Sequence, residues 1–194
     1  MLIERPGSAV QWARAFIFPA LGQGSRAVDA TAGNGHDTLF LAGGVGPGGR
    51  VYALDIQKEA LEKTRKRVSE AGLSDKVIII PGGHQDMVSL VGEPVDAVMF
   101  NLGYLPGGDR SVITRPETTR EGLRAALRIL RQGGRLSVVV YTGHPGSREE
   151  SGEVSGLLAA LDPGENSVQK LLFWNSRGDS PELYFVTRSG GEND

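Results

Sequence analysis

The sequence predicts an α/β protein built on a doubly wound, mostly parallel sheet. Three observations lead to this fold class. Short apolar segments typical of buried strands alternate with amphipathic segments typical of helices. Glycine is abundant, at 28 of 194 residues, and it gathers in turns that follow the apolar segments. The stretch Ala27–Thr38 has the strand, glycine turn and helix order of a nucleotide-type cofactor site.

The expected elements follow one another along the whole chain. Strands are predicted at 27–30, 50–55, 76–80, 95–100, 136–141, 168–174 and 183–187, and helices at 8–18, 36–43, 57–71, 114–132 and 149–161. Thr114 and Glu117 fit a capping box at the start of the fourth of these helices, and Gly133 and Gly134 are expected to end it. The first helix carries Trp12 and Phe16 one turn apart. These two pack against the sheet in the simpler interpretation and cover the cofactor in the other.

Composition narrows the class of protein. The 194 residues fit a single domain spanning 1–194, with a disordered tail expected at about 189–194. The chain has no cysteine, which excludes disulfides and thiolate chemistry and is compatible with a cytoplasmic protein. No signal peptide is visible, and the longest apolar runs fall far below the roughly 20 residues of a membrane span. A net charge of −2 argues against RNA binding over the whole surface but allows a local basic patch.

The glycine turn indicates which cofactor to expect. Gly33 and Gly35 lack a Cβ, so the backbone can turn sharply and approach a ligand. The third glycine of a dinucleotide fingerprint is replaced by Thr38, and no P-loop Lys-Ser/Thr pair is present, which disfavours a nicotinamide-dependent dehydrogenase. Asp29 at the end of the strand suits a ligand with an ammonium group better than a pyrophosphate. S-adenosylmethionine carries both an ammonium and a sulfonium.

A second acid strengthens this assignment. The next strand ends in Asp55, 22 residues after Gly33, where a carboxylate can accept both ribose hydroxyls of an adenosine. The alternative is that Asp55 only caps the helix that begins near Gln57. After the third strand, His84 or Gln85 lies where an adenine would be held.

The fourth strand leads into the segment expected to carry the chemistry. Asn101 and the Leu102 carbonyl could accept the hydrogens of a nucleophilic amine, and Tyr104 could stack on a planar base. Asp109 is a candidate proton acceptor. In the alternative, Asn101 caps a turn and Tyr104 is ordinary packing. The histidines and acids at this edge of the sheet have no ligand spacing on one element, so no metal site is predicted.

At this point the motifs resemble a known family. Asp29-Ala-Thr-Ala-Gly-Asn-Gly-His-Asp-Thr38, Gly83-His-Gln85, Asn101-Leu-Gly-Tyr-Leu-Pro-Gly-Gly-Asp109 and Thr114-Arg-Pro-Glu-Thr-Thr119 together resemble the YtqB/MnmM family. Its members are class I S-adenosylmethionine-dependent methyltransferases, long labelled rRNA methylases. The resemblance covers about 9–187. It implies a Rossmann-like, seven-stranded sheet with an antiparallel last strand, and methylation of the 5-aminomethyl group of a (2-thio)uridine at the wobble position of tRNA.

The resemblance also implies roles for particular residues. Asn34, Asp37, Asp55, Gln57 and His84 would touch the cofactor, and Asn101 and Tyr104 would face the amine. The Asn-Leu-Gly-Tyr segment departs from the Asn-Pro-Pro-Tyr motif of amine methyltransferases, which leaves the pose of the amine open. The full set expected at the cofactor is Asp29, Gly33, Asn34, Gly35, Asp37, Thr38, Asp55, Gln57, His84 and Gln85, and the catalytic set is Asn101, Tyr104 and Asp109.

An RNA substrate finds one local support in the sequence. Seven arginines stand against two glutamates between 110 and 135. Arg110 and Arg115, nearest the expected pocket, are the better candidates for phosphate contacts with the anticodon region, whereas Arg120, Arg124 and Arg128 suit a solvated helix face. The open alternatives are an rRNA or small-molecule amine acceptor and a non-catalytic adenosine-ligand module. The sequence does not decide whether the chain forms a homodimer.

Overall fold

The computed structural model describes residues 7–103, 113–143, 146–176 and 179–189. Its strands are β1 Arg26–Asp29, β2 Arg50–Asp55, β3 Val77–Pro81, β4 Val95–Leu102, β5 Leu130–Val140, β6 Asn166–Leu171 and β7 Glu182–Arg188. Its α-helices are α1 Ala9–Ile17, α2 His36–Gly44, α3 Lys58–Glu70, α4 Met87–Val91, α5 Pro116–Ile129 and α6 Ser147–Ala159, with 3-10 turns at Phe18–Ala20, Ser74–Lys76 and His84–Asp86. The predicted tail from 190 and the segment 104–112 lie outside the described residues.

The seven strands form one sheet in the order β3-β2-β1-β4-β5-β7-β6. The pairs from β3 to β5 are parallel, and β7 runs antiparallel to both β5 and β6. The predicted fold class is therefore confirmed, including the antiparallel last strand. None of the described helices combines the length and the apolar character that a bilayer span requires.

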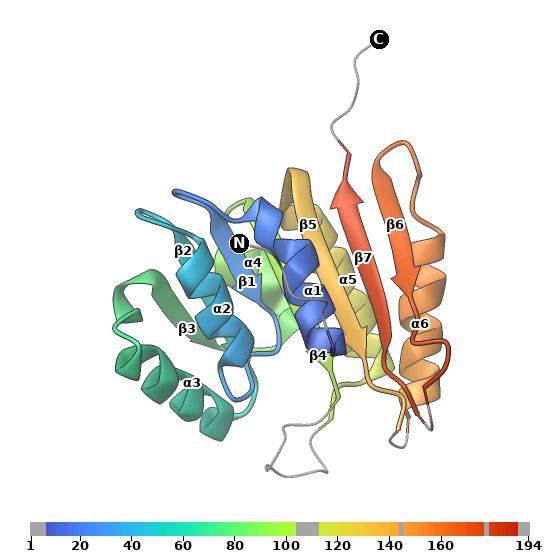
Figure 1. Ribbon diagram of the computed structural model, residues 1–194, viewed down its shortest axis with the longest axis horizontal. Coiled ribbons are helices and arrows are strands. Elements are labelled where there is room, and N and C mark those ends of the chain that lie inside the picture. The colour runs from blue at the N-terminus through green and yellow to red at the C-terminus, as the bar shows by residue number, and fades with distance from the viewer. Residues whose placement is uncertain (1–6, 104–112, 144–145, 177–178, 190–194) are drawn as a thin grey trace.

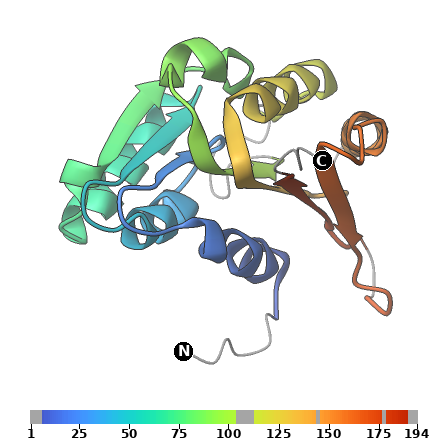
Figure 2. The same cartoon turned by 90° about the horizontal axis from the view of Figure 1, so that it is seen from above.

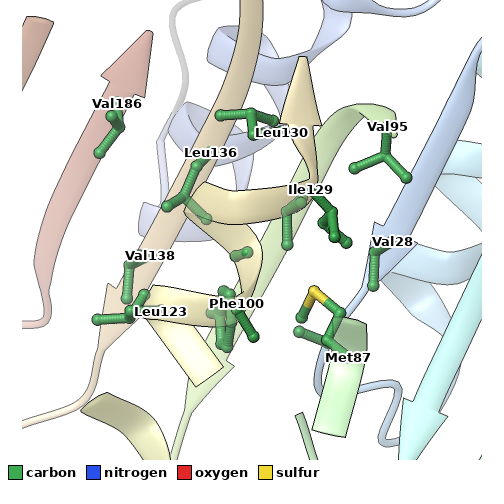
Figure 3. Close-up of a cluster of buried hydrophobic side chains, with 14 of the residues drawn as sticks. Val28, Met87, Val95, Phe100, Leu123, Ile129, Leu130, Leu136, Val138 and Val186 are labelled. Carbon is green, nitrogen blue, oxygen red and sulfur yellow. The ribbon is translucent and has the colours of Figure 1, made fainter. Parts of the chain in front are cut away.

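Two apolar clusters hold the layers together. Helices α1, α2 and α3 cover one face of the sheet, and α4, α5 and α6 cover the other (Figures 1 and 2). On the second face, Met87 of α4 and Leu123 of α5 are fully buried against Phe100 of β4 (Figure 3). The β4 side chains alternate between the two faces, so the strand reads as a continuous apolar run because both faces are covered.

The region between α5 and β5 differs from its prediction. We expected the helix to continue to 132 and the strand to begin at 136, but α5 ends at Ile129 and β5 begins at Leu130. Leu130 leaves the helix in an extended conformation and pairs with Val95, and a register shift follows before regular pairing resumes at Arg135. The two glycines at 133 and 134 therefore lie within the strand rather than ending the helix.

Helix α1 begins as its sequence indicates. The Ser8 hydroxyl accepts the Gln11 N–H at 3.3 Å, and the Gln11 side chain accepts the Ser8 N–H at 3.1 Å, which completes a capping box. Ala9, Ala13 and Ile17 form the buried face of the helix. Its first and second turns pass beside the carboxyl end of β1, where the candidate site lies.

Candidate active site

A cavity of about 610 Å³ opens along the carboxyl ends of the parallel strands. Its walls come from the segments that follow β1, β2, β3 and β4, from the start of α5, from Tyr141 after β5, and from Val10 and Arg14 of α1. The volume lies within the roughly 300–1,000 Å³ typical of small-molecule sites. The chain winds outward from β1 toward β3 and then returns to β4 on the other side, so the cavity lies at the topological switch point of the sheet.

The glycine turn after β1 fits tightly against α3. Gly35 has φ 78°, and a Cβ at this position would lie 2.8 Å from the Thr64 Cα, so only glycine allows α2 to begin here. The Thr64 hydroxyl donates to the Gly33 carbonyl at 3.1 Å, and the Arg67 Nε donates to the Asn34 carbonyl at 2.8 Å. Arg67 of α3 thus holds the turn in place.

Asp55 ties this turn to the start of α3. Its Oδ2 accepts the Gly33 N–H and its Oδ1 accepts the Gln57 N–H, both at 2.9 Å. The carboxylate also lines the cavity, beside Gln57 and the exposed Ile56. Burial raises the pKa of Asp55 above its ordinary value. Asp55 does not cap α3 as in the alternative interpretation, because Gln57 is the N-cap and no side chain caps the helix; Asp55 accepts the N–H of Gln57 instead. The remaining lone pairs leave the carboxylate able to accept from a ligand.

Asp29 and Thr38 do not line the cavity. Asp29 is fully buried beneath it, where its carboxyl accepts from the Thr38 hydroxyl at 2.6 Å and from the Thr31 N–H at 3.3 Å. Burial, together with the charge of Asp37, raises the pKa of Asp29 to about 7. The expectation that Asp29 faces the ammonium of a ligand is therefore corrected. Asp29 and Thr38 therefore support the cavity wall from behind. Asp29 points into the core because it lies at the end of a strand that is covered on both faces.

Asp37 lines the cavity instead and joins three elements. Its Oδ1 accepts from Nε of Arg14 on α1 at 2.7 Å, and its Oδ2 accepts from Nδ2 of Asn101 at the end of β4. The Asn101 backbone N–H donates to the Thr31 hydroxyl at 2.8 Å. The Asn101 Oδ1 is buried and has no hydrogen-bond partner among the described residues. Because the carboxylate of Asp37 can only accept, it fixes which side of the Asn101 amide remains available.

His84 lies at the third wall of the cavity. Its ring packs edge-on against Phe100, with centroids 5.5 Å apart, and against Gly122 of α5, where a Cβ would lie 2.3 Å from the His84 Cδ2. Burial lowers the pKa of His84 to about 4, so the ring is neutral at pH 7. Gln85 also lines the cavity, as expected for this segment.

The Thr114 segment is anchored differently from its prediction. Arg115, not Thr114, occupies the N-cap of α5, and no side chain caps the helix. The Thr114 hydroxyl instead donates to Glu150 of α6 at 2.9 Å, and Thr119 donates to the other oxygen of the same carboxylate at 2.6 Å. Glu150 is 1% exposed, so this contact fixes the end of the segment that follows Asn101. Arg115 lines the cavity, as its assignment to the substrate requires.

The structure thus gathers most of the predicted residues at one site. Of the predicted set, the cavity is lined by Gly33, Asn34, Asp37, Asp55, Gln57, His84, Gln85, Asn101 and Arg115. Tyr104, Asp109 and Arg110 lie outside the described residues, and their roles stay predictions. Sequence reasoning missed Arg14, Thr31 and Tyr141, because nothing near them in the chain marks a contact with a distant strand end. No group of three metal-ligating side chains occurs within the described ranges.

Comparison with known proteins is decisive for the family. Residues 51–187 match the model of a protein family described as “Putative rRNA methylase”. The chain belongs to this family. The match agrees with the predicted YtqB/MnmM resemblance, and members of the rRNA-methylase family with solved structures share the fold over nearly the whole chain.

Two of these solved structures come from bacteria. The protein from Clostridium thermocellum, described as an rRNA-methylase, is 40% identical, with a TM-score of 0.92 over 95% of this chain and 100% of that one. SMU.1697c from Streptococcus mutans, described as a methyltransferase and solved in complex with SAH, is 36% identical, with a TM-score of 0.85 over 96% of this chain and 99% of that one.

A curated plant relative is more similar in sequence. The Arabidopsis thaliana protein named tRNA (mnm(5)s(2)U34)-methyltransferase, chloroplastic, is 49% identical over 174 residues. The match covers 84% of this chain and 63% of the relative, so this chain spans less than two thirds of the plant protein's length.

Proposed function

We propose that the chain is an S-adenosylmethionine-dependent methyltransferase that N-methylates the 5-aminomethyl group of (2-thio)uridine at the wobble position of tRNA. The observation that carries the proposal is the Asn101 amide. Its Nδ2 is bound to Asp37, and its buried Oδ1 is an acceptor without a partner among the described residues. A buried acceptor of this kind is costly unless a donor arrives, and an amine N–H is such a donor.

The residues present fit S-adenosylmethionine. At one end of the cavity, Asp55 offers carboxylate lone pairs beside a glycine turn that admits a close ligand. At the other end, Arg14 and Asp37 place a cation and an anion together, which matches the carboxylate and ammonium of an amino-acid group. Support also comes from the Streptococcus mutans relative, whose structure contains SAH. When bound, the cofactor would supply a methyl group already activated on a sulfonium.

The protein's own contribution to such a reaction is mainly positioning. The Asn101 Oδ1 accepts an N–H of the neutral amine, which aims the nitrogen lone pair away from the protein and toward the cofactor. Leu102 is fully buried beneath it, and the neutral ring of His84 adds no charge to the cavity wall. Asp37 already accepts from two donors and is not assigned as the base. Asp109 remains the proposed proton acceptor.

Partner and location belong to the same proposal. The name of the plant relative supports tRNA as the substrate, and the reading of a wobble uridine requires contacts with the anticodon region. The relative is chloroplastic, and we propose that this chain acts in the cytoplasm, with which its lack of cysteine is compatible. Size-exclusion chromatography would distinguish a monomer from a homodimer.

A methyl-transfer assay tests the proposal directly. Labelled S-adenosylmethionine and bulk tRNA from cells that make the aminomethyl uridine but do not methylate it would be incubated with the protein, and nucleosides analysed by mass spectrometry. We expect one added methyl group on that nucleoside. Transfer to rRNA or to a small amine only would favour the alternative acceptors. SAH binding by calorimetry without transfer to any acceptor would favour a non-catalytic adenosine-ligand module.

A further inference from the structure

Exposed apolar side chains gather at the carboxyl edge of the sheet, beyond the cofactor cavity. Seven large apolar side chains are exposed among the described residues, and four of them follow the carboxyl ends of strands: Ile56, Tyr141, Leu172 and Trp174. Trp174 is 93% exposed, the most of the seven. Water therefore reaches nearly the whole indole of Trp174, a side chain that proteins usually bury in large part.

The direction of β6 places Trp174 on the same edge as Asn101. Strand β7 is antiparallel to both β5 and β6, so β6 points the same way as β5 and β4. Figure 1 shows the arrowhead of β6 and the start of α6 at the same end of the sheet as the end of β4. Neighbouring strands lie about 4.8 Å apart, so the end of β6 is about 10 Å from the end of β5 and about 15 Å from the end of β4.

Two arginines lie at this edge of the sheet. Arg115 at the start of α5 and Arg148 in the first turn of α6 are exposed and form no ion pair among the described residues. The arginines on the outer face of α5 differ, since Arg120 and Arg124 pair with Glu121 or Glu153. Arg115 and Arg148, which are available for phosphate contacts, thus lie at the same edge of the sheet as Trp174. Exposed acids share this edge as well, namely Glu117 in the first turn of α5, Glu149 in the first turn of α6, and Asp179, so charge alone does not define the surface.

We propose that Trp174 stacks on an unpaired base of the RNA substrate that flanks the nucleotide held at Asn101, with Arg115 and Arg148 contacting the backbone between them. The inference rests on the proposed function. Proteins that read single-stranded loops combine aromatic faces, on which bases stack, with cations along the backbone. This edge of the sheet carries both, and the ends of β6 and β4 are about 15 Å apart, which is the span of a few nucleotides rather than of a duplex groove.

Steady-state kinetics separate this contact from the chemistry. Trp174→Ala should raise the KM for tRNA about 10- to 100-fold, the range expected for one lost base stack, while kcat at saturating tRNA and the Kd for SAH stay within about twofold. Trp174→Phe should recover most of the affinity, because it keeps an aromatic face. Arg148→Ala should weaken tRNA binding less and reduce its salt dependence.

Two matched controls lie at the opposite edge. Phe18, which is 49% exposed, follows α1 near the amino end of β1. Arg128 is an exposed arginine in the last turn of α5 that forms no ion pair among the described residues. Phe18→Ala and Arg128→Ala should leave the KM for tRNA within about twofold. An equal loss in these controls would overturn the assignment of this edge.

Tryptophan fluorescence tests the contact without turnover. The chain has two tryptophans, and the other, Trp12, lies half-buried on α1. The substitution Trp12→Phe therefore leaves Trp174 as the single fluorescent reporter. Binding of an anticodon stem-loop should quench its emission and protect it from acrylamide. If the wild type methylates tRNA but Trp174→Ala binds it equally well, this inference fails alone. If Trp174→Ala instead converts a dimer to a monomer, the surface is a protein contact. A wild type that binds no RNA refutes both proposals.

Discussion

The two ends of the cavity are built in different ways. At the Asp55 end, a carboxylate accepts backbone N–H groups of Gly33 and Gln57, so the shape depends on short contiguous segments. At the Asn101 end, the contacts run between side chains of α1, α2 and β4, with Asp37 in the centre. In the proposed function, the first arrangement binds the cofactor, whereas the second orients the Asn101 amide group. We therefore expect substitutions at the two ends to affect binding and turnover separately.

The largest difference between the effects on turnover and on cofactor binding is expected from Asn101→Ala. The variant loses the Oδ1 acceptor and leaves the Asp55 end intact, so kcat should fall about 100- to 1,000-fold, the cost of removing one preorganised hydrogen-bonding group from a reacting centre. The Kd for SAH, measured by calorimetry, should change less than about threefold. Normal turnover at saturating cofactor would show that Asn101 is not catalytic.

Asp55→Ala should produce the opposite pattern. It removes the acceptor for the ligand and also releases the Gly33 and Gln57 N–H groups, so we expect SAH affinity to fall about 100-fold. Calorimetry measures the affinity, and circular dichroism checks that the variant folds. At cofactor concentrations high enough to saturate the variant, kcat should recover to within about fivefold. A variant that binds SAH like the wild type would limit Asp55 to starting α3.

A smaller effect is expected from Arg14→Met. The change leaves Asp37 without its cation, so the carboxylate and the Asn101 amide can turn together, and kcat should fall about 10-fold with little change in the KM for tRNA. Arg14→Lys should recover part of the loss. Arg26→Met is the control, because Arg26 pairs with Glu93 at the amino end of β1 and does not line the cavity. Equal losses in both arginine variants would indicate a general destabilisation.

The smallest effect concerns stability and pH. The pKa of His84 is about 4 in the folded protein and 6.5 in the unfolded chain, so the unfolded chain binds more protons between these values. Stability from this residue is therefore complete above pH 6.5 and is lost as the pH falls toward 4, by at most about 3 kcal/mol. Urea unfolding of wild type and His84→Gln at pH 8, 6 and 5 should show the two curves converging as the pH falls.

The raised pKa of Asp29 changes stability with pH in the opposite direction, so wild type must be compared with His84→Gln rather than measured alone. Its folded pKa of about 7 lies above the ordinary 3.8, so the folded state holds its proton more firmly and stability falls as the pH rises between these values. Both proteins retain Asp29, so its contribution cancels in the difference. A difference that does not change between pH 8 and 5 would contradict the depressed pKa of His84.

The same contrast explains what the sequence could predict. The glycine turn, Asp55 and the strand ends are contiguous signals, and the structure places them as expected at the carboxyl edge. The Asn101 contact with Asp37 joins residues 64 positions apart, and the Arg14 contact joins residues 23 apart. Neither spacing leaves a local pattern. The cavity could thus be located from the sequence, but the network that orients Asn101 could not.

Two errors have a related physical origin. Asp29 was assigned to the ligand because it lies at a strand end. It is buried instead, because α2 packs closely over β1 and the Thr38 hydroxyl of α2 donates to the Asp29 carboxyl. Thr114 matches a capping box in sequence, but the buried Glu150 of α6 competes for its hydroxyl. In both cases a tertiary partner displaced the local interaction that the motif alone favours.

The hairpin of β6 and β7 contributes none of the described residues that line the cavity. On the proposal that Trp174 contacts the RNA, substrate recognition can change without disturbing the cofactor site, because residues 172–176 do not line the cavity. Duplicated copies of such a chain could acquire new acceptors through changes in this short segment alone. For the same reason, 172–176 is the region of the chain to vary first in a library that seeks altered substrate preference.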